Sequence, residues 1–305
     1  MKILKNTNIV FGVSIILGFV LPGWADSMKN LLVPTLMMMM TFSLLEFKFS
    51  EVELNDIKTV LPLFAMNYLL LTGIHIILAF TFIDNELYRN AILILGLMPP
   101  AVGIISMIYI LNGDIHIGFM AEITGYAASL LIIPVMSVVF FGESVTMSKI
   151  FRIIILVIIV PFILSRILTY LDNKYNFLKK DVSEVVVNLG YAILFYITIG
   201  INIDVFLNKL FSLTNIILIV LFLRFGLGAI FYFVFKNKIE KRKHVLYILF
   251  GTFKNGSAGL AFTLLLFNDV QAAVPYAILS IISSLYILFL KYTMSEGGKL
   301  ANKLT

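Results

Sequence analysis

The 305-residue sequence contains no cysteine, one tryptophan and three histidines, and charged residues make up only 13% of it. Without cysteine there is no disulfide framework and no thiolate chemistry. His75, His116 and His244 lie far apart, and no HExxH, Ser-His-Asp or phosphate-binding-loop pattern is present. An intramembrane enzyme would need a nucleophile, metal ligands or paired carboxylates in one cavity, yet the only acid embedded in an apolar run is Glu122. We therefore expect no enzyme activity, no metal site and no cofactor.

What the sequence does have is apolar residues, at 60% of the chain, with a mean hydropathy of +1.02. Such values exclude an ordinary soluble protein. Runs long enough to cross about 30 Å of hydrocarbon recur along the whole length. The polar connections are too short for a second, soluble domain. The sequence thus predicts one all-α membrane domain over residues 1–305 with ten spans, roughly at 8–25, 30–45, 58–83, 90–111, 117–141, 150–171, 185–203, 212–235, 245–267 and 272–292.

The basic residues predict the orientation of these spans. Sixteen lysines and arginines fall on the side of the N-terminus and five on the other side. Because cytoplasmic loops carry the excess of basic residues, we expect both termini in the cytoplasm and a multi-pass protein of the plasma or inner membrane. The basic cluster Lys236 to Lys243 then lies at an anionic leaflet, so the lipid bilayer rather than a nucleic acid is its expected partner. The oligomeric state stays open.

Two of the spans, the fourth and the ninth, are interrupted near their middle. Pro99-Pro100 stops the fourth, because Pro100 lacks an amide hydrogen and disfavours the α conformation of the residue before it. Lys254 to Gly259 interrupts the ninth with polar residues and glycine. The breaks lie five spans apart, and an odd number of spans per half inverts the second half. The pattern predicts two inverted five-helix repeats, approximately 1–145 and 146–305, with broken helices 4 and 9 crossing, as in secondary transporters.

The breaks also predict a binding site. Where each helix restarts, its first amide groups are unpaired and carry about half a positive charge. We expect these helix starts to bind a small organic anion, through Pro100, Ala101, Val102 and Gly103 in the first half and Asn255, Gly256 and Ser257 in the second. Lys254 would add a positive charge to this site. An ammonium near the middle of the bilayer is tolerable only inside a protein cavity, so we expect its side chain to face the site.

These residues resemble the bile acid:sodium symporter family over essentially the whole chain. The family's fourth-span break is followed by a helix ending in a Gly-Asp turn, as Pro99-Pro100 is followed here by Asn112-Gly113-Asp114. The family's ninth-span motif, Glu-x-x-x-Gln-Asn-Ser-Gly-Leu, aligns with Phe250 to Ser257. Leu32 to Ser43 is similar to the family's second span. The resemblance implies a carrier that works by alternating access.

The departures from the family concern its sodium ligands. That family holds sodium with a ninth-span glutamate and glutamine, a third-span amide, and polar groups after the fourth-span break. Here Phe250 and Lys254 replace the acid and the amide, and Ile104 and Ile105 follow the break. Only Asn67 fits the third-span amide. A sodium ion needs several oxygen donors and no neighbouring cation, so we do not expect sodium coupling.

Glu122 lies where the resemblance places another sodium ligand, and we assign Glu122, Lys254 and Asn67 to coupling. Pairing Glu122 with Lys254 would remove much of the cost of burying both charges. Three alternatives stay open: a fixed structural bridge, a bridge broken in each proton or substrate cycle, and two residues that never meet. Proton coupling is therefore also left open.

Other functions of the same inverted-repeat fold stay open as well. An auxin-efflux-carrier-like exporter does not require sodium, and a cation/proton antiporter would carry its ion on Glu122. A sensor that retained the fold without transport is a further alternative. Arg224, in the middle of span eight, is interpreted as pairing or snorkelling rather than as contacting substrate. The run Met37 to Met40 is interpreted as packing.

Overall fold

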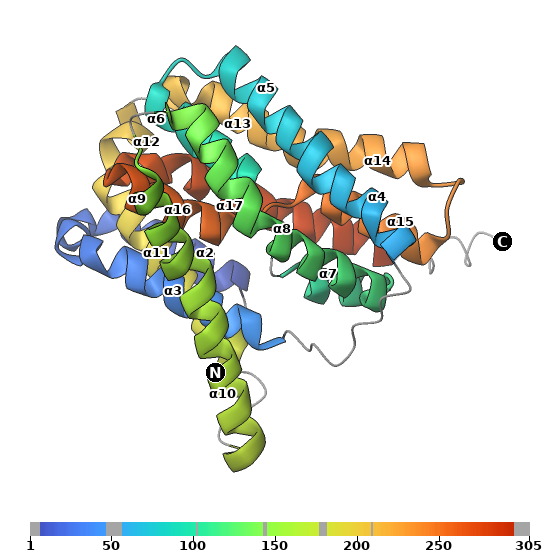
Figure 1. Ribbon diagram of the computed structural model, residues 1–305. Coiled ribbons are helices and arrows are strands. Elements are labelled where there is room, and N and C mark those ends of the chain that lie inside the picture. The colour runs from blue at the N-terminus through green and yellow to red at the C-terminus, as the bar shows by residue number, and fades with distance from the viewer. Residues whose placement is uncertain are drawn as a thin grey trace.

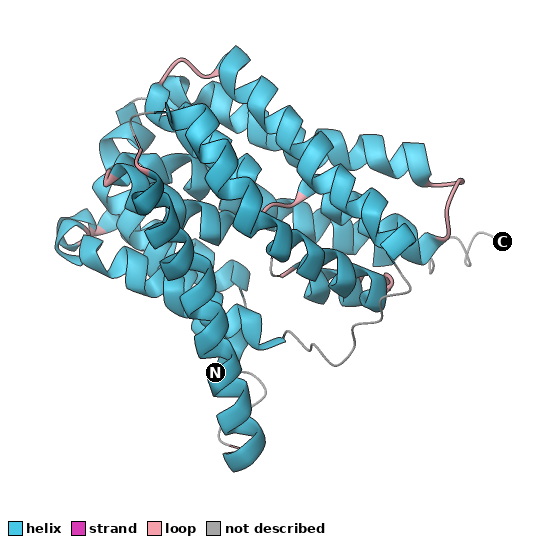
Figure 2. Cartoon of the chain, in the orientation of Figure 1, coloured by secondary structure: helices cyan, strands magenta, loops and turns pink. Residues whose placement is uncertain are grey.

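The computed structural model describes residues 7–46, 57–101, 103–142, 145–176, 182–208 and 210–295. Within these ranges every regular element is a helix, and short loops join the helices (Figure 2). Six helices are long and apolar enough to cross a membrane: Val60–Phe82, Ile115–Phe141, Met147–Tyr175, Val182–Ile201, Phe211–Phe235 and Val270–Met294. The protein is therefore an all-α, multi-pass membrane protein.

The other four expected spans are not continuous helices of that length. Two are short: α2 (Thr7–Val20) and α3 (Leu32–Ser43) have 14 and 12 residues, about 21 and 18 Å at 1.5 Å per residue. The other two are interrupted where the sequence predicted. The fourth comprises α6 (Glu86–Leu97) and α7 (Ile104–Ile110), and the ninth comprises α15 (Lys241–Thr252) and α16 (Gly256–Phe267).

The remaining elements follow each other with short connections. Four of the six long helices contain a π-helical turn: η6, η8 and η10 lie in the interior of their helices, and η12 (Lys291–Ser295) lies at the end of the last one. In chain order the elements are α4 (Ile57–Ala65), η6 (Met66–Leu71), α5 (Thr72–Phe82), α8 (Ile115–Phe141), α9 (Met147–Ile154), η8 (Ile155–Ile159), α10 (Val160–Tyr175), α11 (Val182–Ile201), α12 (Ile203–Asn208), α13 (Thr214–Leu221), η10 (Phe222–Gly226), α14 (Leu227–Phe235) and α17 (Val274–Leu290).

Asparagine and aspartate fix many of the helix ends. Asn112, after α7, and Asn268, after α16, have φ angles of 56° and 53°, a left-handed conformation that ends helices. The Asp114 side chain then accepts the Ile117 amide at the start of α8. Asp269 similarly accepts the Gln271 amide ahead of α17. Both broken spans thus end with the same local chemistry.

The π-helical turns direct large polar side chains into the interior. A π-helical turn inserts an extra residue into the helix and often marks a functional site. Asn67 and Tyr68 come from η6, and Arg224 comes from η10. All three side chains are buried. Each lies near the middle of its span, at the level where the neighbouring helices are broken.

The helices pack as two groups around α16. In one group, α11 lies against α2 and α3, and α10 lies against α3 and projects from the bundle at its C-terminal end (Figure 1). In the other group, α5 packs on α6 and α14 packs on α15. Helix α16 contacts α3 of the first group and α6 of the second. The start of α16 therefore lies at the boundary between the two groups.

Candidate functional site

The two breaks contact each other through the backbone. The amide of Asn255 donates a hydrogen bond of 2.8 Å to the carbonyl of Pro99. Pro100 is buried against α8, where a Cβ added to Gly125 would lie 2.6 Å from the Pro100 Cδ. The absence of a side chain at Gly125 is what lets the proline-containing segment approach α8 this closely.

Side chains satisfy the carbonyls at the broken end of α15. The Asn67 amide nitrogen donates to the carbonyls of Phe250 at 2.7 Å and Phe253 at 3.1 Å. The Arg224 guanidinium donates to the carbonyl of Thr252. Because lipid offers no donors, these contacts replace the helical bonds that the break removes. Asn67, expected to take part in coupling, thus has a direct structural role.

Arg224 is a buried clamp on this helix end. Only 2% of its surface is exposed, so of the two expected roles, pairing and snorkelling, snorkelling is wrong. Its Nε donates to the Ser283 hydroxyl at 2.8 Å, and its guanidinium carbon lies 4.5 Å from the centre of the Phe253 ring. A cation near a helix C-terminus is favourable, because that end of the helix dipole is negative. Arg224 therefore joins span eight to α15 and α17.

Lys254 is buried beside the first break, with 2% of its surface exposed. Its ammonium donates to the Thr72 hydroxyl at 3.1 Å and lies 4.3 Å from the centre of the Tyr68 ring. The Thr72 hydroxyl donates in turn to the carbonyl of Gly96, at the C-terminal end of α6. A hydroxyl, an aromatic face and the negative end of a helix dipole thus stabilise the charge.

Glu122 is fully buried on α8. Among the described residues, no carboxylate lies within ion-pair distance of the Lys254 ammonium, whose contacts are Thr72 and Tyr68. In this conformation the Lys254 side chain extends toward α5. The Tyr68 hydroxyl donates in turn to the carbonyl of Gly125 on α8.

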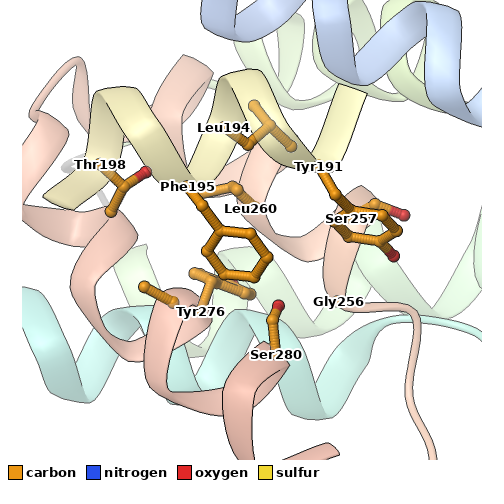
Figure 3. A pocket seen from close by; sticks show the side chains of 10 residues that line it. Tyr191, Leu194, Phe195, Thr198, Gly256, Ser257, Leu260, Tyr276 and Ser280 are labelled. Atoms are coloured by element: carbon orange, nitrogen blue, oxygen red, sulfur yellow. The ribbon is translucent and has the colours of Figure 1, made fainter. Parts of the chain in front are cut away.

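The residues after the second break, Gly256 and Ser257, border a cavity between α11, α16 and α17 (Figure 3). The cavity leaves about 20 Å³ open to the centre of a water molecule. That space holds about one water molecule, which is less than an organic anion needs. Its wall combines hydroxyl groups with aromatic and aliphatic side chains: Tyr191, Leu194, Phe195, Thr198, Ser257, Leu260, Tyr276 and Ser280.

The residues of the first break, which were expected to bind the substrate, differ from one another in exposure. Pro100 is buried, Ala101 is half-buried and Gly103 is exposed. The carbonyl of Ala101 accepts the Ile104 amide at 2.9 Å and so starts α7. Val102 lies outside the described residues. The described residues of this break contact the second break but are not among those that line the cavity beside Ser257.

Several contact residues of the site were not identified from the sequence. Thr72, Tyr68 and Tyr126 are ordinary residues of apolar helices, and Met40 belongs to a run interpreted as packing. Tyr126 accepts a hydrogen bond of 2.5 Å from the Asn255 side-chain amide, and the Met40 sulfur lies 3.7 Å from the same nitrogen. A usable signal was the spacing of Tyr126, one helical turn after Glu122 and on the same face.

Comparison with known proteins identifies no family for this chain. A scan against models of known protein families finds no match to the chain, and a search of curated proteins finds no match either.

Proposed function

We propose that this protein is a secondary active transporter that moves a small organic anion across a membrane by alternating access. We further propose that it is a divergent, bile acid:sodium symporter-like carrier. The observation that carries the proposal is the hydrogen bond between the two interrupted helices, Asn255 to Pro99, with the buried amine of Lys254 next to it. Irregular backbone inside a membrane is tolerated only where protein or a cavity surrounds it.

The repeated order of elements supports the ten-span, inverted-repeat architecture. Helices α6 and α15 both have 12 residues, and each is preceded by a long span with a π-helical turn at its middle. Each is followed by a break, a second helix and a left-handed asparagine, Asn112 or Asn268. Paired broken helices at corresponding positions are typical of secondary transporters. The proposed topology keeps both termini in the cytoplasm of a plasma- or inner-membrane protein.

The clefts at the ends of the broken spans support alternating access. One cleft is lined by Asn112 and Gly113, after α7, together with Lys241 and Arg242. Another is lined by Asn268, after α16, together with Lys149 and Asp269. In the proposed topology these clefts open to opposite sides of the membrane. The cavity beside Ser257 lies between α11, α16 and α17, so a movement of α11 against α16 would expose it.

The chemistry of the site favours an anion with an apolar body. The buried cations Lys254 and Arg224 outnumber the buried carboxylate of Glu122 around the described parts of the breaks. Leu194, Phe195 and Leu260 give the cavity wall an apolar surface, and hydroxyl groups supply donors. Pockets for small molecules combine such apolar walls with a few polar groups in this way. An organic carboxylate is therefore the proposed class of substrate.

For coupling, we propose protons rather than sodium, carried by Glu122 and Lys254. Phe250, at the place of the family's glutamate, is fully buried in the apolar core, and its side chain offers no oxygen. A buried carboxylate and a buried amine are each able to take up or release a proton when the site opens. The same pair keeps a cation/proton antiporter as the second candidate, and an auxin-efflux-carrier-like exporter as a third.

Flux into proteoliposomes tests these proposals. The purified protein is reconstituted, and uptake of a panel of radiolabelled carboxylates is measured under an imposed proton gradient and, separately, an imposed sodium gradient. We expect uptake driven by the proton gradient. Uptake driven only by sodium would refute the coupling proposal, and cation flux without anion flux would favour the antiporter. No flux of any tested solute would count against transport.

A further inference from the structure

The side chain of Asn255, at the second break, has its whole hydrogen-bonding capacity in use. Its oxygen accepts from the Ala258 amide and from the Ser257 hydroxyl, both at 2.9 Å. Its two amide hydrogens point to the Tyr126 hydroxyl at 2.5 Å and to the Met40 sulfur at 3.7 Å. An asparagine amide offers only two donors. A ligand can therefore bind the Asn255 nitrogen only by displacing one of these partners.

Met40 is the partner that is easiest to displace. A thioether is a weak acceptor, whereas the tyrosine hydroxyl is a strong one. The methionine side chain also has three rotatable bonds and adapts easily to a new position. The same sulfur lies 3.5 Å from the Ser257 hydroxyl, so it faces both polar groups of the site at once. Met40 belongs to α3 and the site to α16, the two helices at the boundary between the helix groups.

We propose that Met40 is the gate of the substrate site, and that its sulfur occupies the position taken by a carboxylate oxygen of the transported anion. This inference rests on the proposed transport function for the identity of the ligand. In this conformation the sulfur accepts from the Asn255 amide, while the single O–H of Ser257 is directed to the Asn255 oxygen. When the anion enters from the α3 side, its oxygen takes over the Asn255 donor, and the methionine moves away with α3.

A cysteine reporter tests the gate without any substrate. The natural chain is free of cysteine, so Ser280→Cys, in the cavity wall, supplies one reactive thiol. The rate of its alkylation by N-ethylmaleimide reports how often the cavity opens. Met40→Leu keeps the volume but removes the acceptor, so we expect labelling to become about five-fold faster. Met40→Gln supplies a stronger acceptor at similar length, so labelling should become slower than in the Ser280→Cys parent.

The matched control is Met39→Leu in the same reporter background. Met39 and Met40 are equally buried, with 1% of the surface exposed, but the Met39 side chain lies against Gly190. We expect its labelling rate to match that of the parent. Equal acceleration by Met39→Leu, or a rate unchanged by both Met40 variants, would overturn the gate. Because leucine and glutamine should act in opposite directions, general loosening of the fold cannot produce the expected pattern. If Met40→Leu fails to fold, Met40→Gln alone carries the test, because loosening would make its labelling faster rather than slower.

A second measurement separates this inference from the proposed function. In proteoliposomes, Met40→Leu should lower the KM of a transported carboxylate about five-fold, because the anion no longer competes with the sulfur. If labelling shifts as expected but no carboxylate is transported by any variant, the gate stands and the organic-anion proposal fails. If transport occurs with an unchanged KM and unchanged labelling, the transporter stands and the gate fails.

Discussion

The backbone amide of Asn255 and the carbonyl of Pro99 form a 2.8 Å hydrogen bond that joins the two broken spans. Both groups lie in segments without regular helical structure, and a lipid environment offers neither of them a partner. Each break therefore provides the hydrogen-bond partner for a backbone group of the other break. A displacement of one segment must then be transmitted to the other. Because of this shared hydrogen bond, the two broken segments form one structural unit where they meet.

Substitution of Gly125 by alanine should damage the crossing point. The added methyl group would lie 2.6 Å from the Pro100 Cδ, so either α8 or the break must move. We expect a loss of about 1–3 kcal/mol of stability, typical of overpacking, together with loss of flux. Thermal unfolding in detergent micelles measures the first effect. Gly73→Ala is the matched control, because a Cβ there meets nothing within 4 Å, and alanine favours a helix. Equal effects of both substitutions would contradict the close contact.

Substitution of Asn67 by leucine should loosen the end of α15. It leaves the carbonyls of Phe250 and Phe253 without their donor in a buried place. Each unsatisfied buried group costs about 1–3 kcal/mol, so we expect a clear fall in the unfolding temperature. Asn215→Leu removes a similar bond, to the carbonyl of Phe82, at an exposed site and should have a small effect. If Asn67→Leu is as mild as Asn215→Leu, the capping role is wrong.

Arginine, and not merely a cation, is needed at position 224. Lysine keeps the charge but cannot donate to the Thr252 carbonyl and the Ser283 hydroxyl in the fixed geometry of a guanidinium. We expect Arg224→Lys to lower stability by about 2 kcal/mol. The same exchange at exposed Arg152 should change little. Full stability and full flux in Arg224→Lys would show that charge alone suffices.

Removal of the Lys254 charge should abolish flux driven by a proton gradient if this amine takes part in coupling. Lys254→Gln keeps a donor for Thr72 but cannot carry a proton or lie as a cation over Tyr68. Flux with and without an imposed pH gradient is compared in proteoliposomes, with Lys29→Gln, an exposed position, as control. Unchanged pH-dependent flux in a folded Lys254→Gln protein would leave the lysine with a structural role only.

The proposed topology predicts which side of the membrane each cleft faces. Single cysteines replacing Arg242 and Gln271, both exposed in the surface clefts, should react with a membrane-impermeant maleimide from opposite sides. In intact cells only Gln271→Cys should be labelled, and Arg242→Cys should require permeabilisation. Labelling of both from the same side would exclude the inverted orientation of the two broken spans.

The sequence by itself determined those features that depend on neighbouring residues. Long apolar runs alone indicate a membrane protein, because the hydrophobic effect depends on how much apolar surface a segment carries. Pro99-Pro100 and the polar segment at Lys254 interrupt their helices because proline lacks an amide hydrogen and glycine weakens a helix. Of the ten expected spans, six are long continuous helices, and the segments expected to form the other four are interrupted or short for the same local reasons.

Only the tertiary structure decided which distant groups meet at the breaks. The charge of Lys254 suggested Glu122 as its partner, but packing of α5 on α6 places Thr72 and Tyr68 around the ammonium instead. The side chains of Arg224 and Asn67 similarly donate hydrogen bonds to carbonyls at the end of α15, and the Met40 sulfur accepts one from the Asn255 side chain. These contacts join residues far apart in the chain and depend on how helices pack and on where π-helical turns rotate a side chain. Neither the packing of the helices nor the position of the π-helical turns can be predicted from composition and local spacing.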